Sequence, residues 1–151
     1  MESKKPVKVA MIGVGAISGI YLQNITNTFR EVELTGLCDL IPERAEKGAA
    51  YVTGEIEKGA QAPRPKIYRD MFEAFNDPEV EVILNLTRPY EHFEVTKQAL
   101  LHGKHVYSEK PLGVDMEEAN ELISLAEEHG LLLGGAPDTF MGAGVQTVRR
   151  L

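Results

Sequence analysis

The sequence contains no tryptophan, a single cysteine, and no apolar run that approaches the roughly 18 residues of a membrane span. The lone Cys38 excludes an intrachain disulfide framework and a metal site built from several cysteines, and we predict no metal. The first residues, MESKKPVKV, include lysines but no apolar signal-peptide core, so we expect neither export nor membrane insertion. Basic residues are also scarce, with 16 Lys and Arg against 23 Asp and Glu, which argues against a nucleic-acid partner. We therefore expect a cytoplasmic protein that works on a small molecule.

Short apolar segments alternate with helical patterns along the chain. Val7–Ile12 is almost continuously apolar, as expected of a strand buried on both faces. A helix is expected to begin at Pro42 and to run to about Tyr51, followed by a connection over 53–65 with two glycines and two prolines. Another helix is expected over Tyr90–His102. Six strands alternating with helices predict an α/β fold, a doubly wound and mostly parallel sheet in one domain over 1–151. The other strands are predicted at Val32–Cys38, Lys66–Tyr68, Val80–Leu86, His105–Tyr107 and Leu131–Leu133.

The last part of the chain carries two more amphipathic helical patterns. The first follows Asp115, an N-cap residue, and its expected buried positions are Met116, Ala119, Leu122, Ile123 and Ala126. The second covers Gly142–Leu151 and stops without a glycine, a proline or a polar cap. We interpret this ending as the truncation of a longer chain, although a natural chain can also end in a helix.

Three glycines lie between the first strand and the first helix, with the spacing G-x-G-x-x-x-G. Gly13 would permit a tight turn, and Gly15 would let phosphate groups approach the main chain. Because a helix N-terminus offers free N–H groups and a positive dipole end, this position suits a pyrophosphate. The predicted contacts continue through the first residues of the helix, Ala16, Ile17 and Ser18. Alone the pattern is weak, since glycine turns after strands are common.

Asp39 strengthens the prediction of a dinucleotide site. It follows the second strand and lies 20 residues after Gly19, where a carboxylate would accept hydrogen bonds from the adenosine ribose. The alternative is an ordinary Asp that begins a turn. A carboxylate there would repel a 2′-phosphate, so the sequence favours NAD over NADP, although Arg44 and Lys47 are close enough to soften that preference.

Polar residues also follow the fourth, fifth and sixth predicted strands, where ligands of such sheets collect. Each has an ordinary alternative: Thr87 as a helix cap, His92 as an exposed first-turn residue, and Lys110 as a solvated lysine paired with Glu109. The full set comprises Thr87, Arg88, Pro89, Tyr90, Glu91, His92, Ser108, Glu109, Lys110, Pro111, Pro137, Asp138 and Thr139.

These segments resemble the Gfo/Idh/MocA oxidoreductase family over essentially the whole chain. The resemblance is carried by GVGAISGIY, CDLIPERA, NLTRPYEHFEVTKQALLHGKHVYSEKPLG and GAPDTFMGAGVQTVRRL, of which the EKP element is the most specific. It implies an N-terminal Rossmann domain followed by a larger α/β domain that has no counterpart here. It also implies that Lys110 assists proton transfer beside the nicotinamide, with Glu109 next to it, and that Thr87, Arg88, Pro89 and His92 line the cofactor.

The resemblance implies an NAD-dependent oxidoreductase that transfers hydride to or from a secondary alcohol of a sugar or polyol. The longer protein is expected to form a homo-oligomer through the missing domain, and this chain alone is expected to be inactive. The competing hypothesis is a dinucleotide-sensing or regulatory module without catalysis. The intact EKP sequence favours the enzyme.

Overall fold

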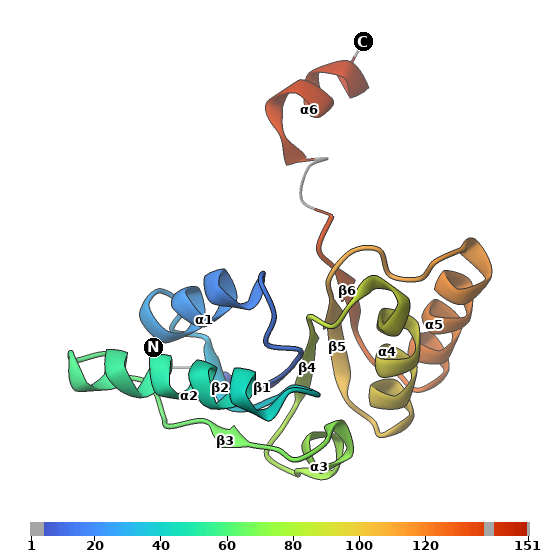
Figure 1. The fold of residues 1–151 in the computed structure, drawn as a ribbon. Helices are drawn as coiled ribbons and strands as arrows, with labels where there is room; N and C mark the ends of the chain where they lie inside the picture. Colours follow the sequence, from blue (N-terminus) through green and yellow to red (C-terminus); the bar gives the residue numbers. More distant parts are fainter. Residues whose placement is uncertain (1–4, 138–140, 151) are drawn as a thin grey trace.

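The computed structural model describes residues 5–137 and 141–150 and contains one six-stranded parallel sheet (Figure 1). The strand order is β3-β2-β1-β4-β5-β6, and every neighbouring pair runs parallel. The chain thus builds outward from β1 to β3, then crosses to β4 on the other side of β1. This order is that of a Rossmann sheet with its switch point between β1 and β4. The strands are β1 (Val7–Ile12), β2 (Val32–Cys38), β3 (Lys66–Ile67), β4 (Val82–Asn85), β5 (His105–Ser108) and β6 (Leu133–Gly135).

Helices cover both faces of the sheet and create two apolar cores. In β1, Val9 and Met11 face a core shared with the first two helices, while Ala10 and Ile12 face a core shared with the next three. This alternation explains why the strand is apolar at almost every position. The helices are α1 (Ser18–Asn27) and α2 (Pro42–Glu57) on one face, and α3 (Met71–Asn76), α4 (His92–Leu101) and α5 (Met116–Glu128) on the other. A short 3-10 turn, η1 (Pro89–Glu91), precedes α4.

Several predicted boundaries shift in the structure. The second helix continues past Tyr51 to Glu57, because Val52 is buried and Ile56 packs against the same core. Gly54 was therefore no helix breaker. The sixth strand starts at Leu133 instead of Leu131, because the Leu131 N–H still bonds the carbonyl of Ala126 in the turn that ends α5. The predicted cap is confirmed, since the Asp115 carboxylate accepts from the N–H of Glu118.

The apolar residues predicted for the buried face of α5 are only partly buried. Leu122 and Ala126 lie in the core, but Met116 is 71% exposed and Ile123 is also exposed.

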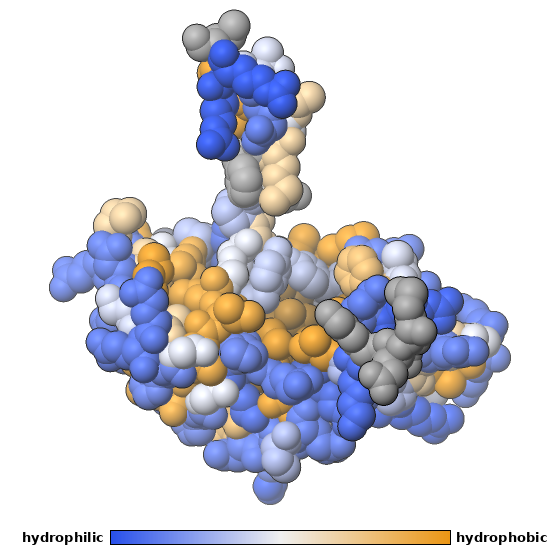
Figure 2. All heavy atoms as spheres, turned by 180° about the vertical axis from the view of Figure 1, so that it is seen from behind, coloured by the Kyte–Doolittle hydropathy of each residue, from blue (hydrophilic) through white to orange (hydrophobic). Residues whose placement is uncertain are grey.

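The last helix, α6 (Ala143–Arg150), stands apart from the layers and buries none of its residues (Figure 1). On the reverse side of the molecule, apolar side chains gather in the middle of the domain below α6 (Figure 2). Within the described residues, no helix combines the length and the apolarity needed to cross a bilayer.

Candidate cofactor-binding site

The glycine turn after β1 lies where the two halves of the sheet meet. Gly13 has φ +93°, and its N–H donates to the carbonyl of Cys38 at 2.8 Å. A Cβ at this position would lie 2.6 Å from the carbonyl carbon and oxygen of Leu86, just beyond β4. Both the left-handed backbone and the close approach of β4 therefore require glycine here.

The turn presents three unpaired backbone donors. Within the described part of the chain, no acceptor receives the N–H groups of Gly15, Ala16 or Ile17. The side of Gly15 is open, since nothing lies within 4 Å of a Cβ placed there. Ser18 is buried under the turn, and its hydroxyl donates to the carbonyl of Gly15 at 2.7 Å. Three successive free N–H groups at a helix start, with open space before them, fit the pyrophosphate of a dinucleotide.

Asp39 follows β2 and fastens the same turn. Its Oδ2 accepts from the N–H of Val14 at 2.7 Å, and its Oδ1 accepts from the N–H of Ile41 at 2.8 Å. The guanidinium of Arg44 lies 3.8 Å from Oδ1, and the Asp39 side chain is only 7% exposed. The bond to Ile41 is the turn-initiating contact that the sequence offered as the alternative, whereas the bond to Val14 in the glycine turn was not indicated by the sequence. An ionised carboxylate has about four lone-pair positions, so two remain for a ribose hydroxyl.

The loop after β4 is organised from below by Asn85. Asn85 is fully buried, and its Oδ1 accepts from the hydroxyl of Thr87 at 2.6 Å and from the Thr87 N–H at 3.3 Å. Arg88 and Glu91 form an ion pair across η1, in which the guanidinium lowers the pKa of the Glu91 carboxyl. Pro89 and Tyr90 are exposed at the same rim. The side chain of Thr87, which the sequence offered as a helix cap, is instead held by its hydrogen bond to Asn85.

The loop after β5 carries the EKP residues. Glu109 Oε1 accepts from the hydroxyl of Tyr21 on α1 at 2.8 Å, which ties this loop to the other half of the sheet. Glu109 Oε2 accepts from the backbone N–H of Lys110 at 3.1 Å. Lys110 is exposed, and no carboxylate in residues 5–137 or 141–150 pairs with its ammonium group. The predicted Lys110–Glu109 contact is therefore a backbone contact, and the ammonium is available to a ligand.

His92 does not lie on the rim. Its ring is 1% exposed and sits at the start of α4, beneath the two loops. Nδ1 is 2.6 Å from the carbonyl oxygen of Pro111, and Nε2 is 3.0 Å from the carbonyl oxygen of Thr87. The sequence offered two alternatives for His92, an exposed residue or one that lines the cofactor. In the structure His92 is instead buried between the loops that follow β4 and β5.

The comparison with known families agrees with this arrangement. Residues 7–135 match the family model described as oxidoreductases with an NAD-binding Rossmann fold. The chain belongs to the Gfo/Idh/MocA oxidoreductase family. The resemblance and the NAD cofactor class inferred from the sequence are thereby confirmed.

Relatives of this Gfo/Idh/MocA domain include several enzymes of polyols and sugars. It is 31% identical over 130 residues to an inositol 2-dehydrogenase/D-chiro-inositol 3-dehydrogenase of Lactiplantibacillus plantarum, covering 86% of this chain and 35% of the relative. It is 39% identical over 90 residues to a 1,5-anhydro-D-fructose reductase of Ensifer adhaerens, covering 60% and 25%. The chain spans about a third of the length of the inositol dehydrogenases it matches, and its match covers a quarter of the reductase.

Solved structures share the fold at lower identity. A myo-inositol dehydrogenase of Lactobacillus casei in complex with NAD(H) and myo-inositol matches with a TM-score of 0.81 and 20% identity, covering 96% of this chain and 40% of that one. A biliverdin reductase of Synechocystis in complex with NADP+ matches with a TM-score of 0.80 and 24% identity, covering 97% and 42%. The fold therefore occurs with both nicotinamide cofactors.

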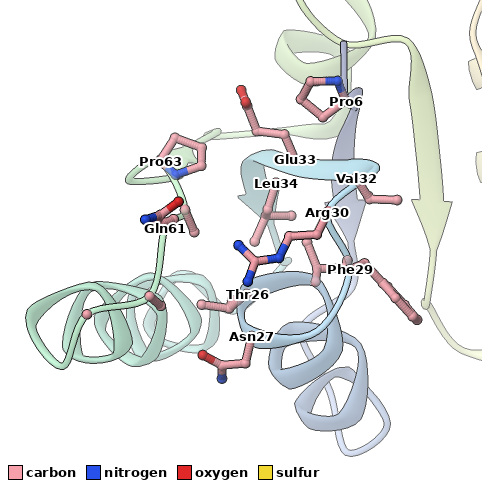
Figure 3. A pocket seen from close by; sticks show the side chains of 14 residues that line it. Pro6, Thr26, Asn27, Phe29, Arg30, Val32, Glu33, Leu34, Gln61 and Pro63 are labelled. Carbon is pink, nitrogen blue, oxygen red and sulfur yellow. The ribbon is translucent and has the colours of Figure 1, made fainter. Parts of the chain in front are cut away.

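A separate hollow of about 520 Å³ lies at the opposite edge of the sheet (Figure 3). Its walls come from the end of α1 and the residues after it, the first residues of β2, Pro6 before β1 and the connection 59–63 after α2, with Arg30 directed into it. Thr26, which lines it, has a buried hydroxyl without a hydrogen-bond partner in the described structure. The strands separate this hollow from the glycine turn, so it is not part of the candidate site.

Of the predicted rim residues, Asp138 and Thr139 lie outside the described part of the chain.

Proposed function

We propose that this chain is the NAD-binding domain of an oxidoreductase that transfers hydride between the nicotinamide and a secondary alcohol or ketone of a sugar or polyol. The observation that supports it most is the convergence of free N–H groups, Asp39 and Lys110 at one edge of the sheet, next to the crossing from β1 to β4. The inositol and anhydrofructose enzymes among the relatives favour a polyol or sugar substrate.

In this proposal each residue has a defined task. The N–H groups of Gly15, Ala16 and Ile17 bind the pyrophosphate, and the remaining lone pairs of Asp39 accept from the adenosine ribose. When bound, the nicotinamide supplies or accepts the hydride. Lys110, whose ammonium pairs with no carboxylate of the described residues, would lie beside the reacting alcohol and stabilise or relay its proton. Thr87, Arg88, Pro89 and Glu109 form the wall around the nicotinamide half.

The substrate-binding part is proposed to lie outside this chain, because the chain spans about a third of its relatives. Catalysis requires a substrate held in place in a site that excludes water. We therefore expect this domain to bind cofactor and to turn over no polyol by itself. A domain that binds NAD, within a longer protein that oxidises none of a panel of polyols, would favour the sensor hypothesis.

Calorimetric titration of the chain with NADH and NADPH tests the cofactor assignment. Gly15→Ala and Gly19→Ala form a matched pair, because a Cβ at either position meets nothing within 4 Å. We expect Gly15→Ala to remain folded and to bind NADH at least about tenfold more weakly, since its methyl group lies where the phosphates approach. Gly19→Ala should bind like the wild type. Equal affinity in both variants, or a folded wild type that binds neither nucleotide, would refute the proposed site.

Asp39→Asn tests the preference for NAD over NADP. The substitution removes the charge that opposes a 2′-phosphate and retains one acceptor oxygen for the turn. Opposite or like unit charges about 4 Å apart interact by about 1 kcal/mol in water, and a phosphate carries nearly two charges. The ratio of NADH to NADPH affinity should therefore fall by about tenfold or more. An unchanged ratio would show that Asp39 does not face the ribose.

A further inference from the structure

We propose that His92 is a positioning residue that clasps the loop after β4 to the loop after β5 and thereby sets the place of Lys110. The importance of Lys110 rests on the proposed function, whereas the clasp itself rests on the contacts of the imidazole ring. His92 carries no proposed chemistry, yet its ring is buried at the centre of the candidate site. The inference explains why a titratable ring occupies that position.

The backbone of His92 is fixed to the sheet before its ring makes any contact. The side-chain amide nitrogen of Asn85, in β4, donates to the carbonyl of His92 at 3.0 Å and to the hydroxyl of Thr96 at 2.9 Å. Asn85 and Thr96 are both fully buried. The start of α4 is therefore anchored to the end of β4, and the ring projects from a rigid base.

The ring contacts one carbonyl oxygen in each loop. Nδ1 lies 2.6 Å from the oxygen of Pro111, and Nε2 lies 3.0 Å from the oxygen of Thr87. A carbonyl oxygen only accepts, so the ring must supply the hydrogen in each bond. We assign an N–H to Nδ1, which makes the shorter contact, and Nε2 faces the carbonyl oxygen of Thr87.

The N–H of Glu109 donates to the carbonyl of Asn85 at 2.8 Å, which ties the loop after β5 to the last residue of β4. Beyond Asn85, no other hydrogen bond within residues 5–137 joins these two loops. The bonds of Thr87 go to Asn85, those of Arg88 go to Glu91, and the N–H of Lys110 goes to Glu109. Because Pro111 directly follows Lys110, a bond to the Pro111 carbonyl limits the movement of the lysine backbone. The buried ring of His92 thus holds the backbone next to Lys110, whose ammonium is exposed.

Three substitutions separate the two halves of the clasp. The amide nitrogen of Asn in His92→Asn can take the place of Nδ1 and preserve the bond to Pro111. The longer His92→Gln places its amide nitrogen near Nε2 and preserves the bond to Thr87. His92→Phe fills the space and donates to neither. His102→Asn is the matched control, because His102 follows the last residue of α4 and, among the described residues, its ring contacts neither loop: Nδ1 bonds the carbonyl of Gln98, and the ring packs against Phe72 and Phe75.

Amide hydrogen exchange of the whole chain, followed by nuclear magnetic resonance without any ligand, gives the first readout. We expect His92→Phe to speed exchange in both loops, His92→Asn to restore protection at Lys110 and Leu112 only, and His92→Gln to restore it at Thr87 and Arg88 only. Exchange in β1 should stay slow in every variant, which shows that the fold is intact. Ring spectra of the wild type should show a proton on Nδ1.

NADH titration of the same proteins gives the second readout. We expect His92→Phe to bind about tenfold more weakly and His92→Asn to recover most of that loss. Unchanged loop exchange in His92→Phe would overturn the clasp, as would identical effects of Asn, Gln and Phe, or a ring with its only proton on Nε2. If the exchange pattern appears as expected and the wild type binds no NADH, the clasp stands and the proposed function fails.

Discussion

Substituting Gly13 by alanine should damage the domain more than any other change in the glycine turn. The new Cβ would meet the backbone of Leu86 at 2.6 Å, and β4 can yield only by moving away from β1. A side chain at a left-handed φ costs about 1–2 kcal/mol, and overpacking against backbone adds about 1–3 kcal/mol. The sum, roughly 2–5 kcal/mol, is a large part of the 5–15 kcal/mol that typically holds a domain together.

Thermal unfolding followed by circular dichroism measures this loss. For a domain of this size each kcal/mol corresponds to about 2–4 °C, so Tm should fall by roughly 4–20 °C. Gly54→Ala is the control, because Gly54 lies in α2 with nothing within 4 Å of an added Cβ. That change should stabilise the helix by about 0.5–1 kcal/mol. If Gly13→Ala unfolds within a degree or so of the wild type, β1 and β4 do not approach as described.

Two further predictions concern titratable groups. Asp77 is partly buried, which opposes ionisation, but hydrogen bonds from Lys66, the N–H of Glu79 and Tyr68 outweigh this and lower its pKa to about 2. Because the folded pKa lies below the ordinary value of 3.8, the stabilisation is present above that value and is lost as the pH falls through about 2. Asp77→Asn should therefore lower the free energy of unfolding by on the order of 1–2 kcal/mol at neutral pH, and the difference should shrink through pH 2 and vanish below it; an undiminished difference in acid contradicts the assignment. Burial, reinforced by the carboxylates of Asp70 and Asp39, raises the pKa of the Cys38 thiol to about 11, so Ellman's reagent should react with it only after denaturation. Rapid reaction of the native protein would show that Cys38 is accessible.

Much of the fold can be predicted from local patterns in the sequence. Strands buried on both faces are apolar throughout, so β1 and β2 were predicted with the observed bounds. Helix caps are local as well, and Asp115 lies at the start of α5 as expected. The parallel direction of the strands was predicted from the alternation of strands and helices.

Exposure of apolar residues was harder to predict. Met116 and Ile123 recur at helical spacing with the buried Leu122 and Ala126, yet both are exposed. Periodicity identifies an apolar stripe, but it does not distinguish a side chain in the core from one at the border of a surface. The width of each stripe is decided by the neighbouring elements, which the local sequence does not specify.

The site divides in the same way. The glycine turn and the polar strand ends were visible because each is a local motif. The bond between Tyr21 and Glu109 joins residues 88 positions apart, and it exists only because the sheet brings α1 beside the end of β5. Asn85 lies inside an apolar strand and shows no signal of its own, although it holds both Thr87 and His92. Such residues are recognised by the partners they acquire on folding.

The two hydrogen bonds that Asp39 accepts from the turn have a thermodynamic consequence for the ligand. Val14 and Ile41 are held by the carboxylate in the folded chain, on either side of the place where a dinucleotide would be bound. The conformational entropy of this turn is therefore lost when the domain folds, and a ligand does not have to order it again. Preorganisation of this kind increases affinity without adding a contact. In the proposed site a substitution at Asp39 would therefore act twice, on the ribose contact and on the rigidity of the turn. A change of cofactor preference that keeps the affinity is better sought at Arg44, whose guanidinium approaches the same carboxylate from solvent.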